Sequence, residues 1–90
     1  MRGIKRKSDE SRLDFDLDFS KSLPDGDVVQ SVETRATDGI ELVSTQTFGN
    51  IVKVWVAGGT ARKTYTVTVI ATSQQGRIIE DCFQIRVTEC

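Results

Sequence analysis

Hydrophobic and polar residues alternate along most of the chain, most clearly between Val52 and Thr72. In the first half of this stretch Val52, Val54 and Val56 share one face, and the pair Gly58-Gly59 ends the run. In the second half the residues of one face are Tyr65, Val67, Val69 and Ala71, with threonines between them. A period of two, rich in β-branched residues and bounded by glycines, is typical of half-buried antiparallel strands.

The same alternation, interrupted by turn residues, predicts further strands. The complete predicted set is Leu13–Ser20, Val28–Thr37, Ile40–Phe48, Ile51–Ala57, Lys63–Thr72 and Arg77–Thr88. The parity of the second strand is mixed, which predicts a β-bulge or a two-sided environment there. Six or seven short strands without helical periodicity predict an all-β fold, an antiparallel β-sandwich.

Size and charge set the organisation of the chain. Its 90 residues are 38% hydrophobic and carry a net charge of −1. Residues 1–12 hold five basic and two acidic side chains (+3), whereas residues 13–90 hold seven basic and eleven acidic ones (−4). We predict a flexible basic N-terminal arm over residues 1–12 and a single domain over residues 13–90. Neither the apolar region of a signal peptide nor a membrane span is predicted.

The two cysteines, Cys82 and Cys90, fall in or just after the last predicted strand. An extended chain would separate them by roughly 26 Å, whereas a disulfide requires Cα atoms about 4.4–6.8 Å apart. We therefore predict free thiols.

Candidate chemistry is sparse. Asp14, Asp16 and Asp18 have the spacing of calcium ligands, but Phe15 and Leu17 between them favour a solvated strand face over an ion-binding loop. The chain has no histidine, which excludes a histidine-based catalytic triad. We predict no enzyme activity, catalytic residue, metal or cofactor. The basic residues Lys5, Arg6 and Lys7 are too few, without interleaved aromatics, to predict a nucleic-acid site.

Trp55 is the strongest candidate for an interaction residue. If the valines of its strand face the core, Ile51, Lys53 and Trp55 lie on the outer surface of a sheet. Tryptophan is enriched at the energetic centres of protein interfaces. The alternative is that Trp55 itself faces the core or covers a loop.

The segment Gly58-Gly59-Thr60, followed by Tyr65 at the start of an alternating strand, resembles immunoglobulin-like and fibronectin type III domains. In such domains a tyrosine hydroxyl bonds back to the upstream backbone. The resemblance implies structural roles for Tyr65, Gly58 and Gly59.

The order of LDFDLDFS, LPDGD and VKVWVAGGTARKTYTVTVIATSQQGR resembles small proteins encoded among phage and prophage structural genes, the phage fiber-tail adaptor family. The resemblance runs from about Leu13 to Val87, and it is most specific at Val54–Thr60, at the Tyr65 strand and at the Gly76-Arg77 turn. Cys82 departs from the family, which usually has a small polar residue there. The resemblance implies an immunoglobulin-like sandwich and a non-enzymatic virion protein joining tail fibers to the tail.

The expected partners are phage tail and tail-fiber proteins, with further copies of the chain in a homo-oligomer. The expected location is the virion, and the host cytoplasm during assembly. Trp55 and Ile51 are the predicted contact residues, with Lys5, Arg6 and Lys7 of the arm as a second contact and strand pairing through Leu13–Ser20 as a further hypothesis. The alternatives are a capsid decoration (cement) protein or another immunoglobulin-like surface-binding module.

Overall fold

Strands account for nearly all of the regular structure. The computed structural model describes residues 3–8 and 11–89, and this part of the chain forms seven strands and one short 3-10 turn. The strands are β1 (Ile4–Ser8), β2 (Leu13–Asp18), β3 (Val29–Ala36), β4 (Ile40–Phe48), β5 (Ile51–Gly58), β6 (Thr64–Ser73) and β7 (Ile78–Thr88), and the 3-10 turn η1 spans Ser20–Ser22. The predicted all-β fold is confirmed, and each predicted strand is present with its ends moved by at most two residues.

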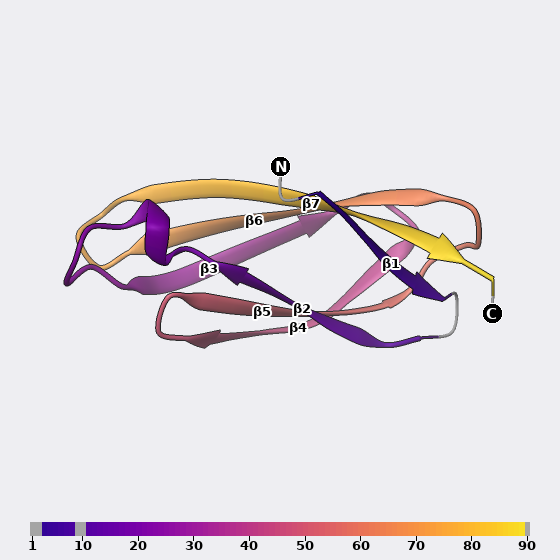
Figure 1. Ribbon diagram of the computed structural model, residues 1–90, viewed down its shortest axis with the longest axis horizontal. Helices are drawn as coiled ribbons and strands as arrows, with labels where there is room; N and C mark the ends of the chain where they lie inside the picture. Colours follow the sequence, from indigo (N-terminus) through magenta and orange to yellow (C-terminus); the bar gives the residue numbers. More distant parts are fainter. Residues whose placement is uncertain (1–2, 9–10, 90) are drawn as a thin grey trace.

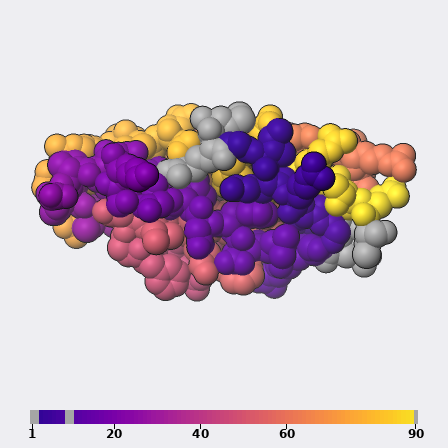
Figure 2. Space-filling view, in the orientation of Figure 1, coloured from indigo at the N-terminus to yellow at the C-terminus, as the bar shows by residue number. Residues whose placement is uncertain are grey.

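The strands form two layers (Figure 1). Within the described residues, the four-stranded sheet has the order β1-β7-β6-β3 and the three-stranded sheet has the order β2-β5-β4. Every pairing between these strands is antiparallel except that of β1 with β7, which is parallel. Figure 2 shows β1 and β2 (indigo to purple) at the surface on one side of the sandwich. The other edge strands, β3 and β4, therefore lie on the opposite side.

β1 differs from the flexible arm predicted over residues 1–12. Its residues pair with β7 from Ile4 opposite Gln84 to Ser8 opposite Thr88. Lys5 and Lys7 occupy the positions opposite the buried residues Ile85 and Val87, where a hydrophobic side chain is expected. The pattern of hydrophobic residues therefore does not predict this strand. Its pairing with β7 uses backbone hydrogen bonds, which do not depend on the hydrophobicity of the side chains.

The core lies between the two sheets, and most of its residues come from the regularly alternating strands. Val52, Val54 and Val56 of β5 are fully buried. The other buried hydrophobic residues are Leu17, Phe19, Leu23, Val29, Tyr65, Val67, Val69, Ala71, Phe83, Ile85 and Val87. The alternation in LDFDLDFS predicts that Leu13, like Leu17, faces inward. Leu13 is instead 37% exposed because it begins an edge strand. The rings of Phe15 and Phe83 meet across the layers at a centroid distance of 5.5 Å.

Two bulges adjust which side chains face inward. The bulge predicted in the second strand lies between Val29 and Ser31 of β3. It makes Val29, and not Val28, the buried residue at the start of that strand. A bulge that was not predicted lies between Leu42 and Ser44 of β4. A bulge inserts one residue and so changes the face on which the following residues lie.

Two further predictions, free cysteine thiols and the absence of a membrane span, can be compared with the described residues. Cys82 is a free thiol on β7, while Cys90 lies outside the described residues. No helix within residues 3–8 and 11–89 is long and apolar enough to cross a membrane.

Candidate interaction surface

The outer face of the three-stranded sheet is built around β5. Because Val52, Val54 and Val56 point into the core, the alternate residues Ile51, Lys53 and Trp55 point outward. The structure thereby selects the outward orientation of Trp55 over the core-facing alternative.

Cross-strand neighbours complete this face in three rows. Trp55 lies between Asp14 of β2 and Ser44 of β4. Lys53 lies between Asp16 and Gln46, and Ile51 lies between Asp18 and Phe48. These nine residues are called the outer face below.

Hydrophobic area on the outer face gathers at the end where β4 turns into β5. Phe48 is 56% exposed and Ile51, directly opposite it, is 39% exposed. Trp55 is half-buried and its indole N–H donates a hydrogen bond to Gln46 Oε1 at 3.3 Å. Exposed aromatic and aliphatic residues next to polar ones are the composition of a protein interface. The alternation in the sequence identified Ile51 and Trp55 but not Phe48, whose face depends on the unpredicted bulge in β4.

The charge of the outer face is acidic. Lys53 Nζ lies 3.1 Å from Asp14 and 4.0 Å from Asp16, and it also lies 5.9 Å from the ring centroid of Phe48. The hydrogen bond to Asp14 raises the pKa of Lys53 above its ordinary value of 10.5, and the charges of Asp16 and Asp14 add to this shift. One ammonium group among three carboxylates leaves a negative surface beside the apolar residues.

The basic residues predicted as a second contact lie elsewhere. Lys5 and Arg6 are exposed, but they belong to β1 in the four-stranded sheet, so the structure does not bring them together with Trp55 and Ile51. Lys7 is only 2% exposed, and its ammonium group donates a hydrogen bond to the carbonyl of Ser8 at 2.6 Å. A buried side chain is not available for contact with another protein, so Lys7 leaves the set of contact residues.

The loop between β5 and β6 places Gly59 beside the core residues Tyr65 and Val87, while Gly58 is exposed. The Tyr65 ring is buried, and its hydroxyl accepts a hydrogen bond from the backbone N–H of Thr60 at 2.9 Å. Its hydrogen bonds with Thr60 lower the pKa of the Tyr65 hydroxyl. Gly58 and Gly59 have φ angles of +76° and +95°, in the region that favours glycine.

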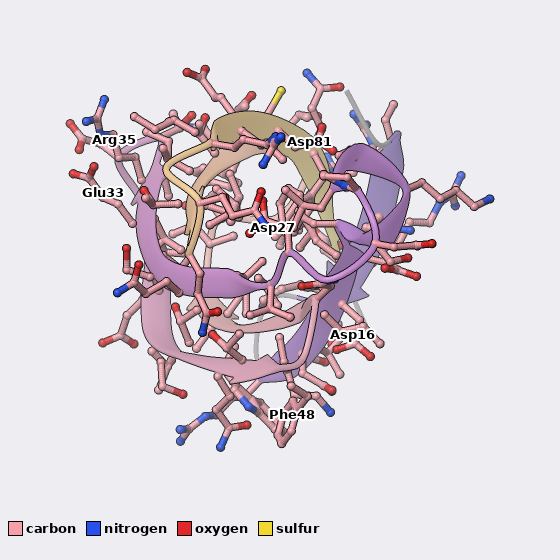
Figure 3. All side chains as sticks on the ribbon, turned by 90° about the vertical axis from the view of Figure 1, so that its left-hand side faces the viewer. Asp16, Asp27, Glu33, Arg35, Phe48 and Asp81 are labelled. Atoms are coloured by element: carbon pink, nitrogen blue, oxygen red, sulfur yellow. The ribbon has the colours of Figure 1, made fainter. Side chains whose placement is uncertain are left out.

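A buried carboxylate at the end of the sandwich was not found by sequence reasoning. The Asp27 side chain points into the interior when the molecule is seen along its length (Figure 3) and is fully buried. It accepts hydrogen bonds from the N–H groups of Val28 and Gln75, and Arg77 Nη1 lies 2.9 Å from Asp27 Oδ2. Burial raises the pKa of Asp27, but hydrogen bonds from Ser73, Gln75 and Arg77 and the Arg77 charge outweigh burial and lower the pKa below 3.8.

The partners of Asp27 come from distant parts of the chain. Arg77 follows the β6–β7 turn, and Asn50 of the β4–β5 turn donates a hydrogen bond to the Asp27 carbonyl at 3.3 Å. Asn50 Oδ1 also accepts a hydrogen bond from the N–H of Val29 at 3.0 Å. These hydrogen bonds link three connections at one end of the sandwich. No local sequence motif predicts this hydrogen-bonded group, because its residues come from three separate turns.

No group of three or more metal-ligating side chains lies together within residues 3–8 and 11–89. A shallow hollow of about 330 Å³ on the four-stranded sheet is lined by Arg35, Ala36, Thr37, Thr66 and Thr68.

Comparison with known proteins gives one family. No curated protein matches the chain. The family model described as "Podophage GP4 fiber-tail adaptor protein gp77" matches residues 7–86. This match extends from β1 to β7 and confirms the resemblance drawn from the sequence. The chain belongs to the Gp77 family of podophage GP4 fiber-tail adaptor proteins.

Proposed function

We propose that this protein is a virion component that joins tail fibers to the phage tail, without catalysis. The observation that carries the proposal is the family match over residues 7–86. An adaptor of this kind binds tail proteins on one surface and fiber proteins on another, and it meets both in the host cytoplasm during assembly. The family does not support the alternatives of a capsid decoration protein or a general surface-binding module.

The proposed fold is an immunoglobulin-like sandwich, and the strand order supports it. In immunoglobulin domains the third, sixth and seventh strands share one sheet, while the second, fourth and fifth share the other. Here β3, β6 and β7 share the four-stranded sheet, and β2, β4 and β5 form the three-stranded sheet. Tyr65 near the start of β6 bonds to the backbone of Thr60, which agrees with the tyrosine corner of such domains.

The proposed contact with one partner is the outer face, centred on Trp55, Ile51 and Phe48. Phe48 and Ile51 are exposed side by side, and Trp55 lies on the same strand as Ile51. Burying such side chains against a partner removes apolar surface from water, and the surrounding carboxylates favour a partner with basic groups. Lys5 and Arg6 on β1 offer a second, basic contact on the other sheet.

The adaptor role is tested by locating the protein on particles of the phage or prophage that encodes it. Immunogold labelling or cryo-electron microscopy should place it where the fibers join the tail, and particles made without it should lack fibers. Particles that carry the normal complement of fibers without this protein would overturn the proposed role.

The contact surface is tested separately by supplying variants in trans to particles that lack the protein. Phe48→Ser should reduce incorporation, because it removes an exposed ring from the outer face. Ile78→Ser is the matched control, since Ile78 is 71% exposed but lies on the four-stranded sheet. If both variants are incorporated like the unchanged protein, the outer face is not the contact.

A further inference from the structure

The edge strands of the two sheets differ in how well they are protected against pairing with another chain. An exposed edge presents unpaired backbone N–H and C=O groups, and charged side chains usually block it. β2 carries three aspartates and β1 three basic residues, so either strand would repel a copy of itself. On the opposite side, the exposed half of β4, Ser44–Phe48, carries no charge, and β3 carries one charge of each sign.

The two charges of β3 are arranged so that the strand is complementary to itself. Glu33 and Arg35 flank Thr34 and project from the outside of the sandwich (Figure 3), with side chains 63% and 66% exposed. Within one chain Arg35 Nη2 lies 3.4 Å from Glu33 Oε1, and a strand pair would exchange this exposed ion pair for contacts between copies. In an antiparallel pair of β3 strands centred on Thr34, Glu33 of each copy lies directly opposite Arg35 of the other. Opposite charges at directly opposed positions stabilise a strand pair, whereas like charges destabilise it.

Apolar side chains along the same side supply a second reason for association. Val32 and Ala36 of β3, with Ile40 and Leu42 of β4, pack against the core but remain partly exposed. A chain laid along this side would cover them, and burial of apolar surface is the main driving force of association.

We propose that a second copy of this chain pairs with the free edge of β3, forming a dimer with twofold symmetry at Thr34. Charge complementarity selects a second copy as the occupant, because each copy presents Glu33 and Arg35 in the order that the other requires. Each interface uses the same residues from both copies, as twofold symmetry demands. The proposal does not depend on the adaptor role, and it leaves the outer face and β1 free for other partners.

Charge reversal tests the proposal on the full chain by analytical ultracentrifugation over a range of concentrations. The unchanged protein should form a reversible dimer. Glu33→Arg or Arg35→Glu alone should weaken dimerisation by about tenfold, because two symmetric pairs change from opposite to like charge. The double variant Glu33→Arg with Arg35→Glu should restore it. Asp25→Arg in the exposed loop before β3, a change in charge equal to that of Glu33→Arg, should have no effect. A chain that stays monomeric throughout, or single variants that dimerise like the unchanged protein, would overturn the proposal.

Cross-linking tests the position of the twofold axis independently. Directly opposed residues of antiparallel strands have Cα atoms about 4.5–5.5 Å apart, within the range of about 4.4–6.8 Å that a disulfide bridges. With Cys82 and Cys90 replaced by serine, Thr34→Cys should form a disulfide-linked dimer on mild oxidation. The exposed control Lys21→Cys should not. Cross-linking of Thr34→Cys no faster than that of the control would refute the proposed axis.

Discussion

Replacing Gly59 by alanine tests how tightly the β5–β6 loop is packed against the core. Both Gly58 and Gly59 have positive φ angles, +76° and +95°, so alanine is strained at either position. The two sites differ in their surroundings. A Cβ atom at Gly59 would lie 2.7 Å from Val87 Cγ2, whereas one at Gly58 would meet nothing nearer than 3.9 Å.

The expected destabilisation follows from these contacts. An L-residue in the left-handed region costs about 1–2 kcal/mol, and the loss of glycine's freedom in the unfolded chain offsets about 0.4–1 kcal/mol of this. Gly58→Ala should therefore lower the free energy of unfolding by about 1 kcal/mol. Gly59→Ala adds overpacking against the fully buried Val87, which costs about 1–3 kcal/mol, so its total should be about 2–4 kcal/mol. For a domain of this size each kcal/mol lowers the melting temperature by about 4–8 °C.

Urea unfolding followed by Trp55 fluorescence and circular dichroism measures these differences. Gly58→Ala is the matched control for backbone strain alone. Adding Val87→Ala completes a double-mutant cycle, in which the cost of Gly59→Ala should fall towards that of Gly58→Ala. If Gly59→Ala and Gly58→Ala differ by less than about 0.5 kcal/mol, the limit within which independent effects usually add, the inferred contact with Val87 is refuted.

Three further predictions concern the buried hydrogen bonds and β1. Asp27→Asn should lower the free energy of unfolding at neutral pH, because the pKa of Asp27 in the folded protein lies below 3.8 and its charged form therefore stabilises the fold above that pH. In urea titrations, the difference in free energy between this variant and the unchanged protein should narrow as the pH falls through the folded pKa. Tyr65→Phe should lower the melting temperature by roughly 4–8 °C, because the N–H of Thr60 loses its acceptor; an unchanged melting temperature would contradict this. Deleting residues 1–8 should also lower the melting temperature, since β1 covers one edge of β7; a truly flexible arm would be removed without effect.

The strands that alternate regularly were predictable from the sequence, and the reason is physical. In β5 and β6 every second residue is buried, so the hydrophobic pattern and the pleat agree. β1 was not predictable in this way, because Lys5 and Lys7 stand where hydrophobic residues would be expected. Its place in the sheet depends largely on backbone pairing with β7, which the pattern of side chains does not reveal.

The surface residues were predictable only where one strand determines them. Ile51 and Trp55 follow from the parity of β5 alone. Phe48 requires the register between β4 and β5, including the bulge near Val43. The Asp27–Arg77 pair requires the ends of distant strands to meet, which no local pattern encodes.

The parallel pairing of β1 with β7 has a consequence for the order in which the molecule is completed during synthesis. Ile4 is made before its partner Gln84, and the five strands β2 to β6 are made between them. During synthesis β1 therefore cannot pair with β7 until β7 has been made. Contacts so distant in sequence slow folding. We expect the four-stranded sheet to close in a late step, after β3 and β6 have already paired.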